Sequence, residues 1–146
     1  MKFPAKSFFL FNLVLVLAIG CFGGYAIHLT SQDNYETDDL HSIGHWILSG
    51  PDTVHLENVL GTEPFARYTY SFNDNNPTES LFFRADLSDS DIDALRQKLL
   101  DDGYEVQPAD DNGKTALRRK GGDYLYLELT PPKQIFIRAR EKRPLS

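Results

Sequence analysis

Hydrophobic residues in this chain form one long run near its start and shorter, periodic groups after it. Residues 8–29 read FFLFNLVLVLAIGCFGGYAIHL and contain no charged side chain. At a rise of 1.5 Å per residue, a helix of this length extends about 33 Å, enough to cross the hydrocarbon core of a bilayer. The pattern therefore predicts a membrane-anchoring helix within residues 1–30.

The charged residues on the two sides of this run differ in sign. Lys2 and Lys6 precede it, whereas acidic residues follow at positions 33, 36, 38 and 39. Positively charged flanks stay in the cytoplasm. We therefore expect a single-pass protein of the cell membrane whose domain lies outside the cytoplasm.

The only cysteine, Cys21, allows other interpretations of the same run. Residues 17–21, LAIGC, resemble a bacterial lipobox, which would make Cys21 the lipid-attachment site. The eight residues after Cys21, FGGYAIHL, stay apolar. This favours an uncleaved anchor, because a lipoprotein usually turns polar soon after its cysteine. A soluble form cleaved near residue 31 ranks last, since no A-x-A-like site is present.

Residues 31–50 predict a linker followed by a short helix. The linker, residues 31–37, reads SQDNYET and is polar. Apolar residues at positions 40, 43 and 47, with Trp46 beside them, form one stripe of a helix that Asp38 or Asp39 would cap. Gly50-Pro51 would end this helix.

The rest of the chain, residues 51–146, predicts a small α+β domain. Residues 52–64 fit either a strand or a helical turn. Alternation in FARYTYSF, residues 65–72, predicts a half-buried strand, with residues 66, 68, 70 and 72 on one face. A loop over residues 73–80 and a second strand over residues 81–87 would complete a hairpin.

The strongest local pattern is SDSDIDALRQKLLDD, residues 88–102. Ser88 is placed to cap a helix, and Asp91 three residues later completes a capping box. Apolar residues at positions 92, 95 and 99 form the core stripe, and Gly103 follows the end of the helix.

The final residues predict a run of strands at 104–108, 115–120, 123–129 and 134–140. Turns at Asn112-Gly113 and Gly121-Gly122 make neighbours antiparallel. The fold class is therefore α+β: an N-terminal membrane-anchoring helix, then a small antiparallel sheet covered by one or two helices.

Composition narrows the classes of function. The formal net charge is −6, which argues against a general nucleic-acid binder. With one cysteine, the chain has neither an intramolecular disulfide nor a cysteine-based zinc site. Phosphate-binding glycine loops and the G-x-S-x-G nucleophile motif are absent, so no catalytic residue and no cofactor are expected.

Two clusters resemble metal sites but are incomplete. His41 and His45 are four residues apart and His55 is ten further on, yet the glutamate of H-E-x-x-H is replaced by Ser42. We expect the first two histidines to face solvent. The acids at positions 89, 91 and 93 begin like a calcium loop but lack its glycine and glutamate, so helix capping explains them better and no metal is expected.

Charge is unevenly distributed along the chain. Residues 30–111 hold eighteen acidic and four basic side chains, whereas residues 114–146 hold nine basic and three acidic ones. On adjacent strands, basic and aromatic residues of the second segment would form a docking surface for an anionic partner. This predicted partner surface consists of Arg118, Arg119, Tyr124, Tyr126, Arg138 and Arg140.

The sequence thus favours a membrane-tethered protein, typical of a bacterial cell envelope, that acts as a non-enzymatic binding or accessory module with a protein partner. The alternative is a periplasmic inhibitor or immunity-type protein, whose acidic surface would suit a basic enzyme cleft. A metal-dependent enzyme built on His41, His45 and His55 is the third hypothesis.

Overall fold

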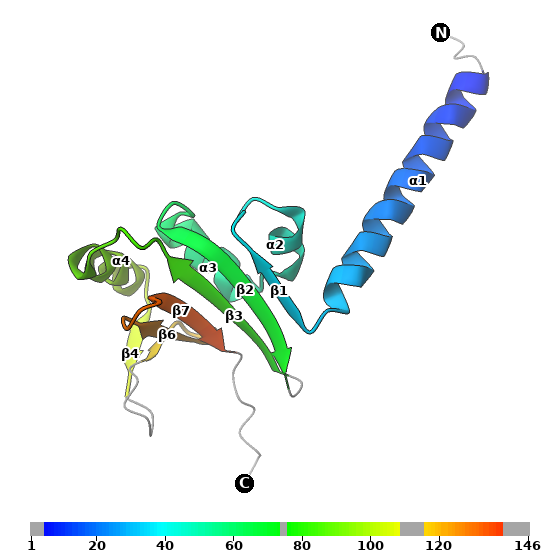
Figure 1. The fold of residues 1–146 in the computed structure, drawn as a ribbon. Coiled ribbons are helices and arrows are strands. Elements are labelled where there is room, and N and C mark those ends of the chain that lie inside the picture. The colour runs from blue at the N-terminus through cyan, green and yellow to red at the C-terminus, as the bar shows by residue number, and fades with distance from the viewer. Residues whose placement is uncertain (1–4, 74–75, 109–115, 139–146) are drawn as a thin grey trace. The chain divides into compact units, whose positions relative to one another are not determined.

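The fold is known from a computed structural model, which describes residues 5–73, 76–108 and 116–138. Contacts divide the chain into two compact units, Met1–Gln32 and Asp33–Ser146. Figure 1 labels most of their helices and strands. The two units are described separately.

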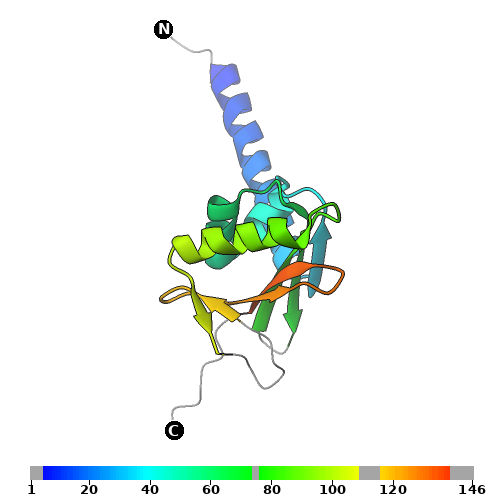
Figure 2. The ribbon, with the colours of Figure 1, turned by 90° about the vertical axis from the view of Figure 1, so that its left-hand side faces the viewer.

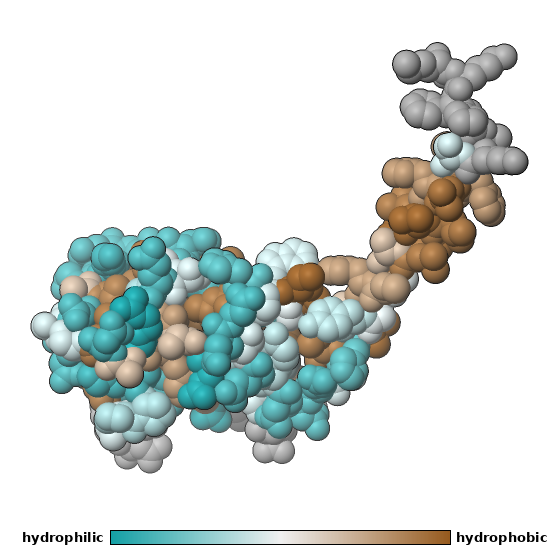
Figure 3. All heavy atoms as spheres, turned by 45° about the horizontal axis from the view of Figure 1, so that its top comes forward, coloured by the Kyte–Doolittle hydropathy of each residue, from teal (hydrophilic) through white to brown (hydrophobic). Residues whose placement is uncertain are grey.

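The first unit is a single helix, α1 (Ala5–Thr30). Its segment Ser7–Thr30 has a mean hydropathy of 2.1 and is long enough to cross a bilayer. Polar side chains bond within the helix: Asn12 Nδ2 donates to the Phe8 carbonyl at 2.8 Å. In Figure 3 this helix is mainly brown, the colour of hydrophobic residues. Length and composition are compatible with a transmembrane anchor or a signal sequence.

The second unit contains an antiparallel sheet whose described strands lie in the order β1-β2-β3-β7-β6-β5-β4. The strands are β1 (Asn34–Thr37), β2 (Phe65–Asn73), β3 (Asn76–Phe83), β4 (Glu105–Gln107), β5 (Ala116–Arg118), β6 (Tyr124–Glu128) and β7 (Gln134–Arg138). Pairing of β3 with β7 joins the first hairpin to the later strands. All pairings are antiparallel, as predicted.

The described part of this unit also contains the helices α2 (Ile43–Leu48), α3 (Pro51–Leu60) and α4 (Asp89–Asp101). Figure 2 shows α4 lying across the strands, with α3 on the same side. The core lies between these layers, where Leu56 of α3 and Ile92 of α4 are fully buried together with Tyr68 and Leu81 of the sheet. The predicted α+β class is confirmed.

The predicted helix at residues 88–102 is confirmed in detail. Ser88 is the N-cap, its side chain accepts from the Asp91 N–H, and Asp91 accepts in return from the Ser88 N–H. Gly103 follows the helix with a φ of +102°, a conformation that favours glycine. A local sequence signal was sufficient here because every partner in the cap lies within a few residues.

The region before α3 differs from the prediction. Residues 34–37, expected in a linker, form β1 and pair with β2 from Asn34↔Ser71 to Thr37↔Tyr68. Helix α2 begins at Ile43 with Ser42 as its N-cap, so neither Asp38 nor Asp39 caps it. Residues 52–64 were predicted as either a strand or a helical turn. The first nine of them are helical, since α3 runs from Pro51 to Leu60.

The expected apolar stripe of this short helix is also wrong. Its buried residues are Gly44, His45 and Leu48, whereas Ile43 and Trp46 are 54% and 72% exposed. Gly44 is turned inward because it lies against the Tyr35 ring: a Cβ there would be 2.2 Å from the Tyr35 hydroxyl. Leu48 is thus the one large apolar side chain of α2 that is buried, whereas Ile43 and Trp46 remain outside.

The first hairpin is displaced from the prediction. β3 begins at Asn76, within the expected loop, and ends at Phe83. Residues 84–87 form a turn in which Arg84 is paired with Asp86. A bulge between Phe65 and Arg67 returns Phe65 to the buried face, where its ring stacks on Phe83 with centroids 5.2 Å apart. Strict alternation along residues 65–72 is therefore broken at its first residue.

The later strands match their predicted positions within the described residues. Gly121 turns the β5–β6 hairpin with a φ of +79°. The expected turn at Asn112-Gly113, and the last two residues of the predicted strand at 134–140, lie outside the described residues.

Candidate functional site

The three histidines considered as metal ligands have different surroundings. His41 is exposed. His45 is buried, and its Nε2 lies 2.7 Å from Glu57 Oε1 on α3. His55 Nε2 lies 2.7 Å from Asp102 Oδ2, next to the end of α4. No group of three or more potential metal ligands occurs among the described residues.

His45 therefore does not face solvent as the sequence suggested. Its Nδ1 lies 3.0 Å from Ser49 Oγ, so Ser49, His45 and Glu57 are linked in the order of a hydrolase triad. Two features oppose a catalytic role. The Ser49 hydroxyl also donates to the His45 carbonyl at 2.7 Å, and His45 is only 3% exposed, which keeps a substrate from its ring.

A second buried group lies next to this histidine. Tyr68 of β2 donates its hydroxyl proton to Glu79 of β3 at 2.7 Å, and the Gly50 N–H donates to the same carboxylate oxygen at 2.9 Å. The rings of His45 and Tyr68 meet edge to face, with centroids 4.3 Å apart. These contacts join the residues before α3 to the centre of the first hairpin.

Burial determines the protonation of this group. Desolvation raises the pKa of Glu79 above its usual value, although the hydrogen bonds from Gly50 and Tyr68 oppose the shift. Desolvation and the neighbouring Glu79 carboxylate raise the pKa of Tyr68, which remains a donor. These residues resemble a structural polar network, because their buried donors and acceptors form hydrogen bonds with one another inside the core.

A second polar cluster connects α3 to the β5–β6 hairpin. Asp52, at the start of α3, accepts from Arg119 Nε at 3.1 Å and from the Asp123 N–H at 2.8 Å. Gly122 makes room for this contact, because a Cβ there would be 2.8 Å from Asp52 Oδ1. Arg119, predicted on the partner surface, instead holds α3 to the sheet.

Four other residues of the predicted partner surface lie on one face of the sheet, opposite the face that α3 and α4 cover. Tyr126 pairs across the strands with Ala116 and with Phe136, and Tyr124 pairs with Arg138. We call this the open face, because Figure 2 shows none of the described helices over it. Its predicted members are Arg118, Tyr124, Tyr126 and Arg138, while Arg140 lies outside the described residues.

The side chains of the open face form a continuous aromatic and cationic row. The Arg118 guanidinium lies 4.9 Å from the centroid of Tyr124 and donates to the Gly122 carbonyl at 3.1 Å. Ring centroids are 6.3 Å apart for Tyr124 and Tyr126 and 6.4 Å apart for Tyr126 and Phe136. Phe136 was missed at the sequence level, although alternation in QIFIR places it on the same face as Arg138.

A shallow hollow of about 560 Å³ lies near the edge of the open face. Its walls include Arg67 over the Phe82 ring at 4.5 Å, together with Arg84 and Lys133. Each of these cations is already paired, with Glu36, Asp86 and Asp89 respectively. The hollow therefore has cationic walls whose charge is largely compensated.

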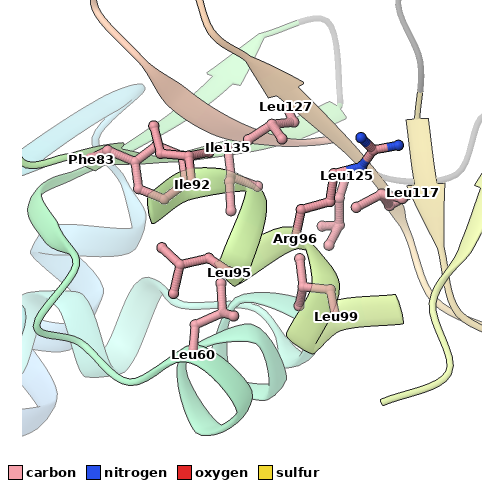
Figure 4. A pocket seen from close by; sticks show the side chains of 10 residues that line it. All are labelled: Leu60, Phe83, Ile92, Leu95, Arg96, Leu99, Leu117, Leu125, Leu127 and Ile135. Carbon is pink, nitrogen blue, oxygen red and sulfur yellow. The ribbon is translucent and has the colours of Figure 1, made fainter. Parts of the chain in front are cut away.

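The space beneath α4 holds no ligand-sized cavity. Figure 4 shows the lining residues, among them Leu95 and Leu99 of α4, Leu60 of α3 and Leu125 of the sheet. These residues enclose about 10 Å³, which is about the least that one water molecule needs. We interpret it as ordinary core packing.

Two other candidates from the sequence were the acids at the start of α4 and Cys21. Of the acids that resembled a calcium loop, Asp91 belongs to the capping box and Asp89 is paired with Lys133 Nζ at 2.6 Å. Cys21 is exposed within the unbroken helix α1.

The chain matches no protein-family model, and no curated protein or solved structure is similar enough to count as a relative. Function must therefore be argued from the chain's own surfaces.

Proposed function

We propose that this protein is a membrane-anchored, non-enzymatic binding module whose domain lies outside the cytoplasm. The apolar helix α1 is retained as the anchor, with Lys2 and Lys6 on the cytoplasmic side. Acidic residues follow the helix directly, which supports this orientation.

The open face is the proposed binding site. The observation that carries this proposal is the row of Tyr124, Tyr126 and Phe136 rings with Arg118 and Arg138 beside them. Tyrosine and arginine are the residues that dominate binding energy at protein interfaces. A sheet surface with these side chains suits a protein partner that presents acidic residues between apolar ones.

Burial of His45 and Glu79 supports a binding function over catalysis. His45 and Glu79, which have the chemistry of a general base, are 3% and 9% exposed. Both are engaged in hydrogen bonds within the core. The open face offers accessible side chains, but these are suited to recognition.

Site-specific photo-crosslinking in intact cells tests this proposal. A photoreactive phenylalanine analogue at position 126 should yield one product of defined mass, and Arg138→Glu in the same chain should remove that product. The control carries the analogue at Gln97, which is exposed on α4 in the other layer, and should yield no such product.

Equal products from positions 97 and 126, or none from either, would contradict the proposed site. The identity of the captured protein also tests the alternative function. A toxin or hydrolase inactivated by the purified chain would indicate an inhibitor or immunity-type protein rather than an accessory module.

A further inference from the structure

Large apolar side chains are exposed near the first strand of the second unit. Trp46 and Ile43 on α2 are 72% and 54% exposed, and Phe72 at the end of β2 is 41% exposed. Trp46 is the only tryptophan in the chain. A single exposed apolar side chain is common on protein surfaces, but several large ones in one region mark an interaction site.

These residues are fixed near the beginning of β1 by direct contacts. The Phe72 N–H donates to the Asp33 carbonyl at 2.8 Å. On α2, the Ser42 hydroxyl lies 3.3 Å from the Tyr35 hydroxyl, and Gly44 lies against the same ring. Both apolar sites are therefore held next to residues 33–35.

The chain leaves little distance between this region and the end of α1. Helix α1 ends at Thr30 and β1 begins at Asn34, with three residues between them. Fully extended, the four Cα–Cα steps from Thr30 to Asn34 reach only about 14 Å. If α1 spans a bilayer, the start of β1 must remain within that distance of the end of the span, close to the lipid headgroups.

We propose that Ile43, Trp46 and Phe72 form a lipid-contact site that inserts into the interface of the same membrane in which α1 is anchored. Tryptophan is enriched at this depth of a bilayer, because its ring is apolar and its N–H can bond to water or headgroups. This inference rests on the proposed retention of α1.

Acidic residues near the site determine which lipid headgroups it binds. Asp33, Glu36, Asp38 and Asp39 lie within the same short stretch, and one of them, Glu36, forms an ion pair with Arg67 at 3.0 Å. These acids oppose an anionic surface. The site should therefore bind zwitterionic headgroups and weaken as anionic lipid is added.

The single tryptophan allows a direct test with the full-length chain in phosphatidylcholine vesicles. Trp46 emission should shift to shorter wavelength, be quenched by lipids brominated on their acyl chains, and be protected from aqueous acrylamide. Ile43→Ser and Phe72→Ser should each reduce the quenching. The control, Val106→Ser, removes a side chain that is 49% exposed on β4, at the other end of the sheet order, and should change nothing.

Vesicle flotation in the same samples separates the two proposals. A chain that floats while Trp46 remains open to acrylamide and unquenched by brominated lipid overturns the lipid-contact site and leaves the anchor intact. Protection from acrylamide without lipid quenching also overturns it, since a protein or a second copy would then cover Trp46. Failure to float overturns the anchor, and the lipid-contact site with it.

Discussion

The Tyr68 hydroxyl donates a hydrogen bond of 2.7 Å to Glu79 across the neighbouring strands β2 and β3. Tyr68 is fully buried and Glu79 is 9% exposed. A carboxylate in such surroundings costs stability when it is charged, and the donors Tyr68 and Gly50 compensate only part of that cost.

The first prediction concerns the pH dependence of stability at Glu79. Its pKa in the folded state is raised above the ordinary value of 4.5, so the folded state holds the proton more tightly than the unfolded state. The contribution of Glu79 to the free energy of unfolding is therefore fully present below pH 4.5. It is lost as the pH rises through the raised pKa. Glu79→Gln keeps an acceptor for Tyr68 and removes the titration.

We expect Glu79→Gln to be more stable than the parent chain at neutral pH and to lose this advantage on acidification. Thermal unfolding of the full chain in detergent micelles over a pH series measures the difference. Tyr68→Phe is the matched variant: it removes one donor and should destabilise by about 1–3 kcal/mol. A Glu79→Gln advantage that persisted below 4.5 would contradict the argument.

The second prediction concerns the contact between Asp52 and Arg119. Asp52→Ala removes the acceptor of both the Arg119 guanidinium and the Asp123 N–H, and should destabilise by about 2–4 kcal/mol. Arg119→Met should cost less, about 1 kcal/mol, because the Arg119 side chain is 33% exposed and Asp52 keeps its backbone donor. Urea unfolding of the two variants checks the order, and equal losses would show that the backbone contact contributes nothing.

Sequence reasoning succeeded where the partners of a residue are close in the chain. Ser88 and Asp91 are three residues apart, and their capping box was predicted with its acidic variant. Alternation in β6 and β7 likewise placed Tyr124, Tyr126 and Arg138 correctly on one face. In these cases the period of the backbone determines which side chains lie together.

Predictions failed where the deciding contact joins distant residues. His45 appeared to face solvent, but Glu57 on another helix satisfies its ring. Residues 34–37 looked like a linker because only Tyr35 among them is apolar, yet pairing with β2 makes them a strand. Arg119 was predicted on the same partner surface as Arg118. It instead binds Asp52 of α3, which is 67 residues away along the chain.

The third prediction isolates the capping box of α4. Ser88→Ala removes the side-chain acceptor of the Asp91 N–H, so one donor at the start of the helix loses its partner. Helix caps of this type contribute about 0.5–2 kcal/mol, and we expect a loss in that range by urea unfolding. Ser90→Ala is the comparison: Ser90 is exposed within the first turn and its hydroxyl lies 2.9 Å from Ser88 Oγ, but the substitution leaves the cap acceptor in place, so we expect a smaller loss. Equal effects of the two substitutions would argue against the cap.

The last prediction distinguishes the anchor from a lipoprotein signal. Helix α1 continues for nine residues beyond Cys21, to Thr30, and the apolar segment Ser7–Thr30 is long enough to span a bilayer only if these residues belong to it. If the chain is an uncleaved anchor, Cys21→Ser leaves its size and its membrane fraction unchanged. If Cys21 is lipidated, the same substitution blocks processing, and a larger precursor accumulates while fatty-acid labelling disappears. Electrophoresis of membrane fractions, with metabolic labelling by a palmitate analogue, measures both effects. A precursor in the variant would show that the part of α1 before Cys21 is absent from the mature protein, and the three-residue link between membrane and domain would be replaced by the longer segment from Cys21 to Asp33.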